Sequence, residues 1–202
     1  VQKAYCTDRG FEACVLGQQV LGGHGYVTEW GLEQNVRDAR IAQIYEGANG
    51  VQALDLMGRK TVRSNGELLD ILSGEMDEFV ASQKDVEAMH PYLAAFEKCR
   101  ERLAQATSSV LASSGDDANA VGAASYSYME LMGLVLYCFM WQRILSAALA
   151  DQKSGSNDTD YTDALVKTGE FFLQRLLPRT ESLLVEITSG AESLMAMRAE
   201  QF

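Results

Sequence analysis

Residues 18–60 decide the fold, and they read QQVLGGHGYVTEWGLEQNVRDARIAQIYEGANGVQALDLMGRK. Three glycines among residues 22–25 interrupt a helix that we expect over residues 3–21, because glycine disfavours helix interiors. Apolar residues then recur at helical spacing and predict two further helices, over residues 32–44 and 51–62. This part of the chain is therefore predicted to consist of helices joined by two short loops.

Both loops carry groups that can bind a ligand or accept a proton: the glycine loop at residues 22–25 and the loop at residues 45–50. The backbone amides of the glycine loop can bind an anion, and the missing side chains let a ligand approach closely. At the second loop, Glu46 is a single carboxylate at the corner between two helices. A carboxylate on an apolar corner can act as a proton acceptor. It can equally sit near the start of the next helix because an acid suits the helix dipole there, and the residues alone leave both interpretations open.

The remainder of the chain is also predicted to be helical. Pro91 suits the first turn of a helix, and Pro178 should kink or weaken another. Long apolar-periodic stretches separated by short polar linkers, with no β-type alternation, predict an all-α, four-helix-bundle-like arrangement. We expect its helices over residues 67–84, 91–112, 119–152 and 163–199, with linkers over 113–117 and 155–160.

Charge divides the 202 residues into two regions. The net charge is −11, yet residues 1–63 hold seven basic and seven acidic residues, so the whole excess of acid lies in residues 64–202. We therefore expect a joint near residues 63–66. An acidic chain argues against a nucleic-acid partner, since phosphate binding needs a basic face. The chain begins with Val1 rather than Met, so we expect the numbering to start inside a longer protein.

Membrane insertion is not expected. The most apolar stretch, residues 132–141, lies between Glu130 and Arg143, which is too short for a spanning helix and favours a buried core helix. The four cysteines form no CxxC pair and are predicted to be reduced thiols, which indicates a cytoplasmic location.

No metal site is expected either. Glu87 and His90 form an ExxH pattern, but a di-metal site needs that pattern on two helices, and the other histidine, His24, lies outside such a pattern.

The paired motifs resemble those at the C-terminal end of the acyl-CoA dehydrogenase family of flavoenzymes. The residues that carry the resemblance are QVLGGHGY at 19–26, Glu33, RDA at 37–39 and IYEG at 44–47. It covers about residues 1–63, and implies the last helices of the family's C-terminal helical domain. Residues 64–202 resemble the helical extension of the subgroup that includes 3-methylmercaptopropionyl-CoA dehydrogenases.

The resemblance implies an oxidoreductase. Glu46 takes the position of the catalytic base, which removes the α-proton of an acyl-CoA thioester while the N5 atom of FAD takes the β-hydride and a trans-2-enoyl-CoA forms. Gln19 and Gly23 match residues that contact the adenine-dinucleotide part of an FAD bound mainly by a neighbouring subunit, and Gly22 belongs to the same loop and is expected to share in this cofactor site. The implied partners are acyl-CoA, an electron-transfer flavoprotein or similar acceptor, and further copies of the chain in a homo-oligomer.

Some positions depart from the family pattern. Ala48 and Gly50 stand where common members have Thr and Gln, so backbone groups of Ala48 and Asn49 would have to make the cofactor contacts. Arg37 is expected to form an ion pair with Asp38 or Glu33. Because family members draw most flavin and acyl-CoA contacts from other parts, the chain alone is expected to be inactive. The alternative is a non-catalytic helical interaction module on the same scaffold.

Overall fold

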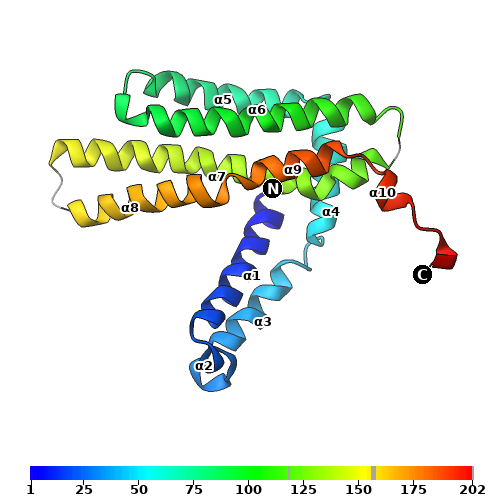
Figure 1. The fold of residues 1–202 in the computed structure, drawn as a ribbon, viewed down its shortest axis with the longest axis horizontal. Helices are drawn as coiled ribbons and strands as arrows, with labels where there is room; N and C mark the ends of the chain where they lie inside the picture. Colours follow the sequence, from blue (N-terminus) through cyan, green and yellow to red (C-terminus); the bar gives the residue numbers. More distant parts are fainter. Residues whose placement is uncertain (118, 156–157, 202) are drawn as a thin grey trace.

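The computed structural model describes residues 1–117, 119–155 and 158–201, and within these ranges it is helical and contains no strand (Figure 1). The all-α prediction is confirmed for this part of the chain. The main elements are α1 (Gln2–Val20), α2 (Gly23–Tyr26), η1 (Thr28–Trp30), α3 (Leu32–Ala42), α4 (Asn49–Leu54), η2 (Asp55–Val62), α5 (Glu67–Gln83), η3 (Glu87–Met89), α6 (His90–Ser113), α7 (Ala120–Ser154), α8 (Thr159–Phe171), η4 (Phe172–Leu176), α9 (Arg179–Thr188), α10 (Glu192–Met195) and η5 (Ala199–Gln201).

Helices α1 and α3 form an antiparallel pair that projects from the rest of the molecule as an arm, with α2 at its tip (Figure 1). The predicted helices over residues 3–21 and 32–44 match α1 and α3 to within two residues at each end. The third predicted helix begins two residues early, at Asn49, and its second half, η2, is a π-helix. After the turn that follows α3, α4 and η2 cross the long helices of the bundle and pack against α7 (Figure 1).

The bundle contains α5, α6, α7 and the α8–η4–α9 segment lying side by side (Figure 1). Pro91 lies in the first turn of α6, as predicted. Helix α7 has 35 residues and is about 52 Å long at the usual rise per residue. Its Phe139 ring stacks on Phe96, with ring centroids 5.7 Å apart, and its Tyr128 hydroxyl lies 2.8 Å from that of Thr107.

The arm and the bundle share one hydrophobic core. Tyr5 of α1 belongs to the same buried cluster as residues of α5, α6, α7 and α9, and so do Ala53 of α4 and Met57 of η2. The Tyr5 ring packs edge-on against Tyr137, with centroids 5.0 Å apart. Arg9 Nη2 lies 3.1 Å from Glu130 Oε1, which ties α1 to α7.

The last helix departs from the prediction of one segment over residues 163–199. Asp158 caps α8 by accepting a hydrogen bond from the Tyr161 N–H at 3.1 Å, so the helix starts four residues earlier. Pro178 ends the π-helical segment η4 instead of only kinking the helix, and α9 ends at Thr188, shortly before Gly190 with φ of +76°. Of the predicted linker over residues 155–160, positions 156–157 lie outside the described residues.

Within the described residues, one helix, α7, is long and apolar enough to cross a membrane. Of its most apolar window, 56% is buried inside the molecule. Leu134, Val135 and Cys138 are among its buried residues, so the predicted core helix over residues 132–141 is confirmed.

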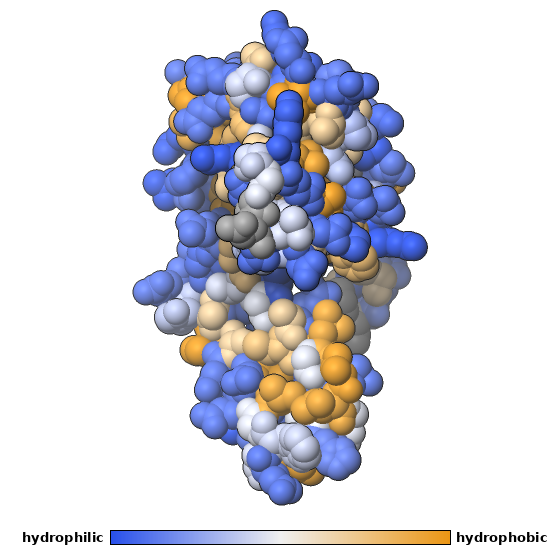
Figure 2. Space-filling view, turned by 90° about the vertical axis from the view of Figure 1, so that its left-hand side faces the viewer, coloured by the Kyte–Doolittle hydropathy of each residue, from blue (hydrophilic) through white to orange (hydrophobic). Residues whose placement is uncertain are grey.

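Apolar surface gathers over the arm, whereas the bundle above it is mostly hydrophilic on the face seen in Figure 2. The exposed large apolar side chains of the arm include Leu16, Val20, Tyr26, Trp30 and Ile41.

Candidate functional site

The turn between α3 and α4 carries Glu46 in an unusual backbone conformation. Glu46 has φ of +53° and Gly47 has φ of +83°. Two consecutive left-handed residues reverse the chain sharply, and this region is unfavourable for a residue with a side chain. The Glu46 carbonyl oxygen accepts a hydrogen bond from Gln52 Nε2 at 2.9 Å. The turn thus presents the Glu46 side chain, which is exposed, at the corner where the sequence placed it.

Helix α1 holds the other side of this turn. Lys3 Nζ donates to the Gly47 carbonyl oxygen at 2.8 Å and to Asn49 Oδ1 at 2.7 Å. Asn49 is 5% exposed, and its Nδ2 donates to the Ala4 carbonyl oxygen at 3.1 Å and to Thr7 Oγ1 at 3.0 Å. The side chain of Asn49 is therefore engaged inside the protein, while Ala48, the residue before it, is exposed.

The glycine loop forms a second group of predicted residues. Gln19, Gly22 and Gly23 line one polar hollow of about 320 Å³, together with Val15, Gln18 and Tyr26. Gly25 is required at the back of this loop, because a Cβ there would lie 2.2 Å from the Gln18 carbonyl oxygen. The structure thus brings the three predicted cofactor residues of this loop together.

The two groups do not meet within this chain. The glycine loop precedes α3 and the Glu46 turn follows it, so the 11 residues of that helix separate them by roughly 16 Å along its axis.

Arg37 forms the expected structural ion pair. Its Nε lies 2.8 Å from Glu33 Oε2, four residues earlier on α3, and its Nη2 donates to Glu33 Oε1 at 3.1 Å. The hydrogen bond from Arg37 lowers the pKa of the Glu33 carboxyl. Of the two candidate partners, Glu33 is the one that Arg37 binds.

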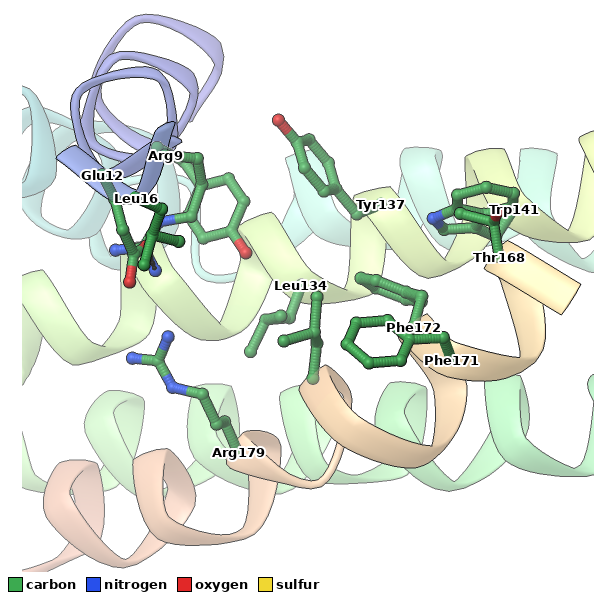
Figure 3. A pocket seen from close by; sticks show the side chains of 12 residues that line it. Arg9, Glu12, Leu16, Leu134, Tyr137, Trp141, Thr168, Phe171, Phe172 and Arg179 are labelled. Atoms are coloured by element: carbon green, nitrogen blue, oxygen red, sulfur yellow. Dashed lines mark ion pairs between the residues drawn. The ribbon is translucent and has the colours of Figure 1, made fainter. Parts of the chain in front are cut away.

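A larger cavity, of about 520 Å³, lies between α1 and the α7–η4 face (Figure 3). Its walls are mostly aromatic or aliphatic, and Arg9, Glu12 and Arg179 lie at one end. Neither Glu46 nor the glycine loop lines this cavity. Its lining residues are Tyr5, Arg9, Glu12, Leu16, Leu134, Tyr137, Trp141, Thr168, Phe171, Phe172, Leu176 and Arg179.

The ExxH pattern has a local structural role. His90 Nε2 lies 2.8 Å from the Lys84 carbonyl oxygen, across the short connection between α5 and α6. Over residues 1–117, 119–155 and 158–201, no group of three or more His, Cys, Asp or Glu side chains is placed to hold a metal ion.

Two family models match the chain. The one described as "Acetyl-CoA dehydrogenase C-terminal like" matches residues 72–198, which is more than half of the chain, and "Acyl-CoA dehydrogenase, C-terminal domain" matches residues 1–60. The chain belongs to the acyl-CoA dehydrogenase family. The family inferred from the paired motifs is confirmed.

Similar proteins include two that align with nearly the whole chain. The 3-methylmercaptopropionyl-CoA dehydrogenase of Ruegeria pomeroyi is 33% identical over 202 residues, covering 96% of this chain and 33% of the relative. The broad-specificity linear acyl-CoA dehydrogenase FadE5 of Mycobacterium tuberculosis is 27% identical over 210 residues, covering 100% of this chain and 34% of the relative. A butyryl-CoA dehydrogenase of Syntrophomonas wolfei is 34% identical over 83 residues, covering 41% of this chain and 14% of the relative. The chain spans about a third of the length of the first two relatives.

Within this family member, the sequence motifs did not indicate the polar side chains that bind the Glu46 turn or the Asp8 carboxylate beneath it. Lys3 and Asp8 come from α1, Gln43 from the end of α3, and Tyr126 from α7. Helical spacing could have indicated Asp8. It follows Ala4 by four residues and Tyr5 by three, so it lies on the same, buried face of α1 as these two residues.

Proposed function

We propose that this chain supplies the catalytic base and part of the cofactor site of an FAD-dependent acyl-CoA dehydrogenase, which converts an acyl-CoA thioester to a trans-2-enoyl-CoA. The observation that carries the proposal is the left-handed turn that presents Glu46 inside a sequence of this family. Glu46 would remove the α-proton of the thioester. Bound FAD would supply the acceptor for the β-hydride.

The residues of the glycine loop fit part of an extended cofactor. An added Cβ at Gly22 or Gly23 would have no neighbouring atom within 4 Å, so the surface over both residues is open to a ligand. Gln19, in the wall of the same hollow, offers a side-chain amide that can both donate and accept hydrogen bonds. We propose that these three residues contact the FAD of a neighbouring subunit.

The loop at residues 45–50 offers fewer groups for a cofactor contact than the glycine loop does. Ala48 has no hydroxyl, and the side chain of Asn49 is used internally. The Asn49 N–H also donates to the Gln43 carbonyl oxygen at 3.1 Å. We propose that any cofactor contact at these two positions is made through the remaining backbone groups.

A thioester α-proton is weakly acidic, so its base needs a dry site that raises the base's pKa. Glu46 is exposed in this chain. We propose that acyl-CoA, together with protein surface outside residues 1–202, covers Glu46 during the reaction. It follows that the chain on its own should be inactive.

The proposal includes an organisation and partners. We propose residues 1–63 as the end of the dehydrogenase domain and residues 64–202 as its helical extension. The apolar surface over the arm supports assembly into a homo-oligomer (Figure 2). An electron-transfer flavoprotein or a similar protein would reoxidise the flavin. The four free thiols support a cytoplasmic location, and the burial of much of α7 supports a protein that does not insert into membranes.

A second candidate is a non-catalytic helical interaction module. Ala48 and Gly50, at positions where common family members have Thr and Gln, favour it. The two candidates differ in what they require of Glu46, because only an enzyme needs a carboxylate at that position.

The deciding experiment uses the protein expressed from the complete reading frame. Its absorption spectrum is recorded before and after anaerobic addition of 3-methylmercaptopropionyl-CoA, butyryl-CoA and longer linear acyl-CoAs. We expect a flavin band that bleaches with at least one thioester. We also expect Glu46→Gln to keep the band but to bleach at least a hundredfold more slowly, because general acid–base catalysis contributes about 10²–10⁴-fold.

Glu75→Gln is the matched control, since it removes one exposed carboxylate from α5 and should bleach like the unchanged protein. If no thioester bleaches the flavin, acyl-CoA thioesters are not the substrates and the proposed reaction is wrong. A protein that FAD cannot reconstitute would support the interaction module.

A further inference from the structure

A buried carboxylate lies beneath the Glu46 turn. Asp8, on α1, is 9% exposed. Its Oδ1 accepts hydrogen bonds from Asn49 Nδ2 and Gln43 Nε2, both at 2.7 Å, and its Oδ2 accepts one from the Tyr126 hydroxyl. Burying a charge is costly unless hydrogen bonds compensate it, and here three donors from three different elements do so.

Two of these donors flank the turn directly. Gln43 is the C-cap residue of α3, where the turn begins, and Asn49 is the first residue of α4, where the turn ends. Asp8 therefore joins the two ends of the turn through a single carboxylate oxygen. The left-handed Glu46 lies between those ends, and such a conformation persists only where surrounding contacts determine it.

The third donor comes from the extension. Tyr126 lies on α7, 118 positions after Asp8, and its hydroxyl binds the carboxylate oxygen that the turn does not use. Burial and the Asp8 carboxylate both raise the pKa of Tyr126, so its hydroxyl stays protonated and remains a donor. The position of Asp8 is thus set from α7 as well as from α1.

We propose that Asp8 and Tyr126 are positioning residues for Glu46, and that through them helix α7 of the extension holds the catalytic turn in place. This inference rests on the proposed function, in which Glu46 is the base. A base has to lie within hydrogen-bond distance of the proton that it removes, so a small displacement of the turn slows proton transfer. The extension then contributes to catalysis through one hydroxyl, without touching substrate.

A purely structural role predicts different results. If the Tyr126–Asp8 bond only fastened α1 to α7, its loss would lower the melting temperature and leave the turn and kcat unchanged. A positioning role predicts a lower kcat with an unchanged KM, because Glu46 acts on the α-proton and not on binding. It also predicts local loosening of the turn, which amide hydrogen exchange detects without any substrate.

The test is Tyr126→Phe in the complete protein with FAD bound. We expect the rate of flavin bleaching by acyl-CoA and kcat to fall about tenfold with KM unchanged, since misplacing reacting groups by 1 Å can cost up to about a hundredfold. We expect several-fold faster amide exchange in the peptide that covers residues 43–52. Asp8→Asn should show both effects more strongly. The amide nitrogen of the new Asn side chain cannot accept a hydrogen bond, so at least one of the three donors would lose its acceptor.

Tyr92→Phe is the matched control. It removes a tyrosine hydroxyl that also binds a carboxylate, Glu170 Oε1 at 3.2 Å, but between α6 and α8. We expect it to leave kcat and the exchange of residues 43–52 unchanged. Equal slowing by Tyr92→Phe and Tyr126→Phe would overturn the inference, as would unchanged exchange and kcat in Tyr126→Phe.

Glu46→Gln, measured alongside, separates this inference from the proposed function. If Glu46→Gln bleaches like the unchanged protein, Glu46 is not the base and the proposed function fails. If Glu46→Gln is inactive while Tyr126→Phe is normal in both readouts, only the positioning role fails.

Discussion

Tyr5 shows how a single side chain can join the arm to the bundle. It is 3% exposed and lies against Tyr137 of α7. Burial raises the pKa of its phenol to about 12, because the charged form would lose its hydration. The neutral phenol is therefore favoured in the folded protein.

A dependence of stability on pH follows. The unfolded chain loses the Tyr5 proton near pH 10, the usual pKa, and the folded protein near pH 12. Between these values the unfolded state binds fewer protons, so rising pH favours unfolding. We expect Tyr5→Phe to weaken the decline in melting temperature between pH 10 and pH 12. Tyr161→Phe, which changes an exposed tyrosine, should leave the decline as it is; equal effects of both substitutions would contradict the prediction.

Single residues of the site could be predicted unevenly from the sequence. The motif indicated Glu46, and the structure places it on an exposed turn; its role as a base stays a prediction. Asp8 and Tyr126 could not be paired from the sequence, because 118 positions separate them and only the packing of α1 on α7 brings them together.

At the scale of elements, α1 approaches α7 closely at a glycine. A Cβ at Gly133 would lie 2.4 Å from ring atoms of Tyr5. Because Gly133 has no side chain, the Tyr5 ring can pack directly against the backbone of α7.

We expect Gly133→Ala to destabilise the protein by about 1–3 kcal/mol, the usual range for overpacking a core, despite the better helix propensity of alanine. Denaturant unfolding of the complete protein measures the change. Gly74→Ala on α5 is the control, because an added Cβ there meets no atom within 4 Å and should leave stability equal or higher. A Gly133→Ala protein as stable as the Gly74→Ala protein would show that Tyr5 moves aside freely.

The helices themselves were largely predictable from apolar periodicity. Helices α1, α3, α5, α6 and α7 begin and end within two residues of the expected positions. The π-helical segments η2 and η4 were not predicted, since a wider turn depends on packing against neighbouring helices and not on local preference. The prediction of a single helix over residues 163–199 was wrong. Pro178 and Gly190 interrupt the helix there, although apolar residues continue at helical spacing around them.

At the scale of the whole molecule, the division in charge near residue 63 does not divide the core. Tyr5, Ala53 and Met57 are buried in the same cluster as the bundle. Residues 1–63 thus complete their core with residues supplied by α7.

We expect residues 1–63, expressed alone, to lack a cooperative thermal transition by circular dichroism, because these apolar side chains would face water. Residues 1–202 should show such a transition. A cooperative transition in residues 1–63 would mean that these residues fold without the bundle.

The hydrogen bond between Tyr126 and Asp8 also has a consequence for ancestry. A descendant without Tyr126 would leave Oδ2 of this buried carboxylate without that donor, while Asn49 and Gln43 would still bind Oδ1. Across related genes, a hydrogen-bond donor at position 126 is therefore expected to accompany an acid at position 8, so that the two positions change together.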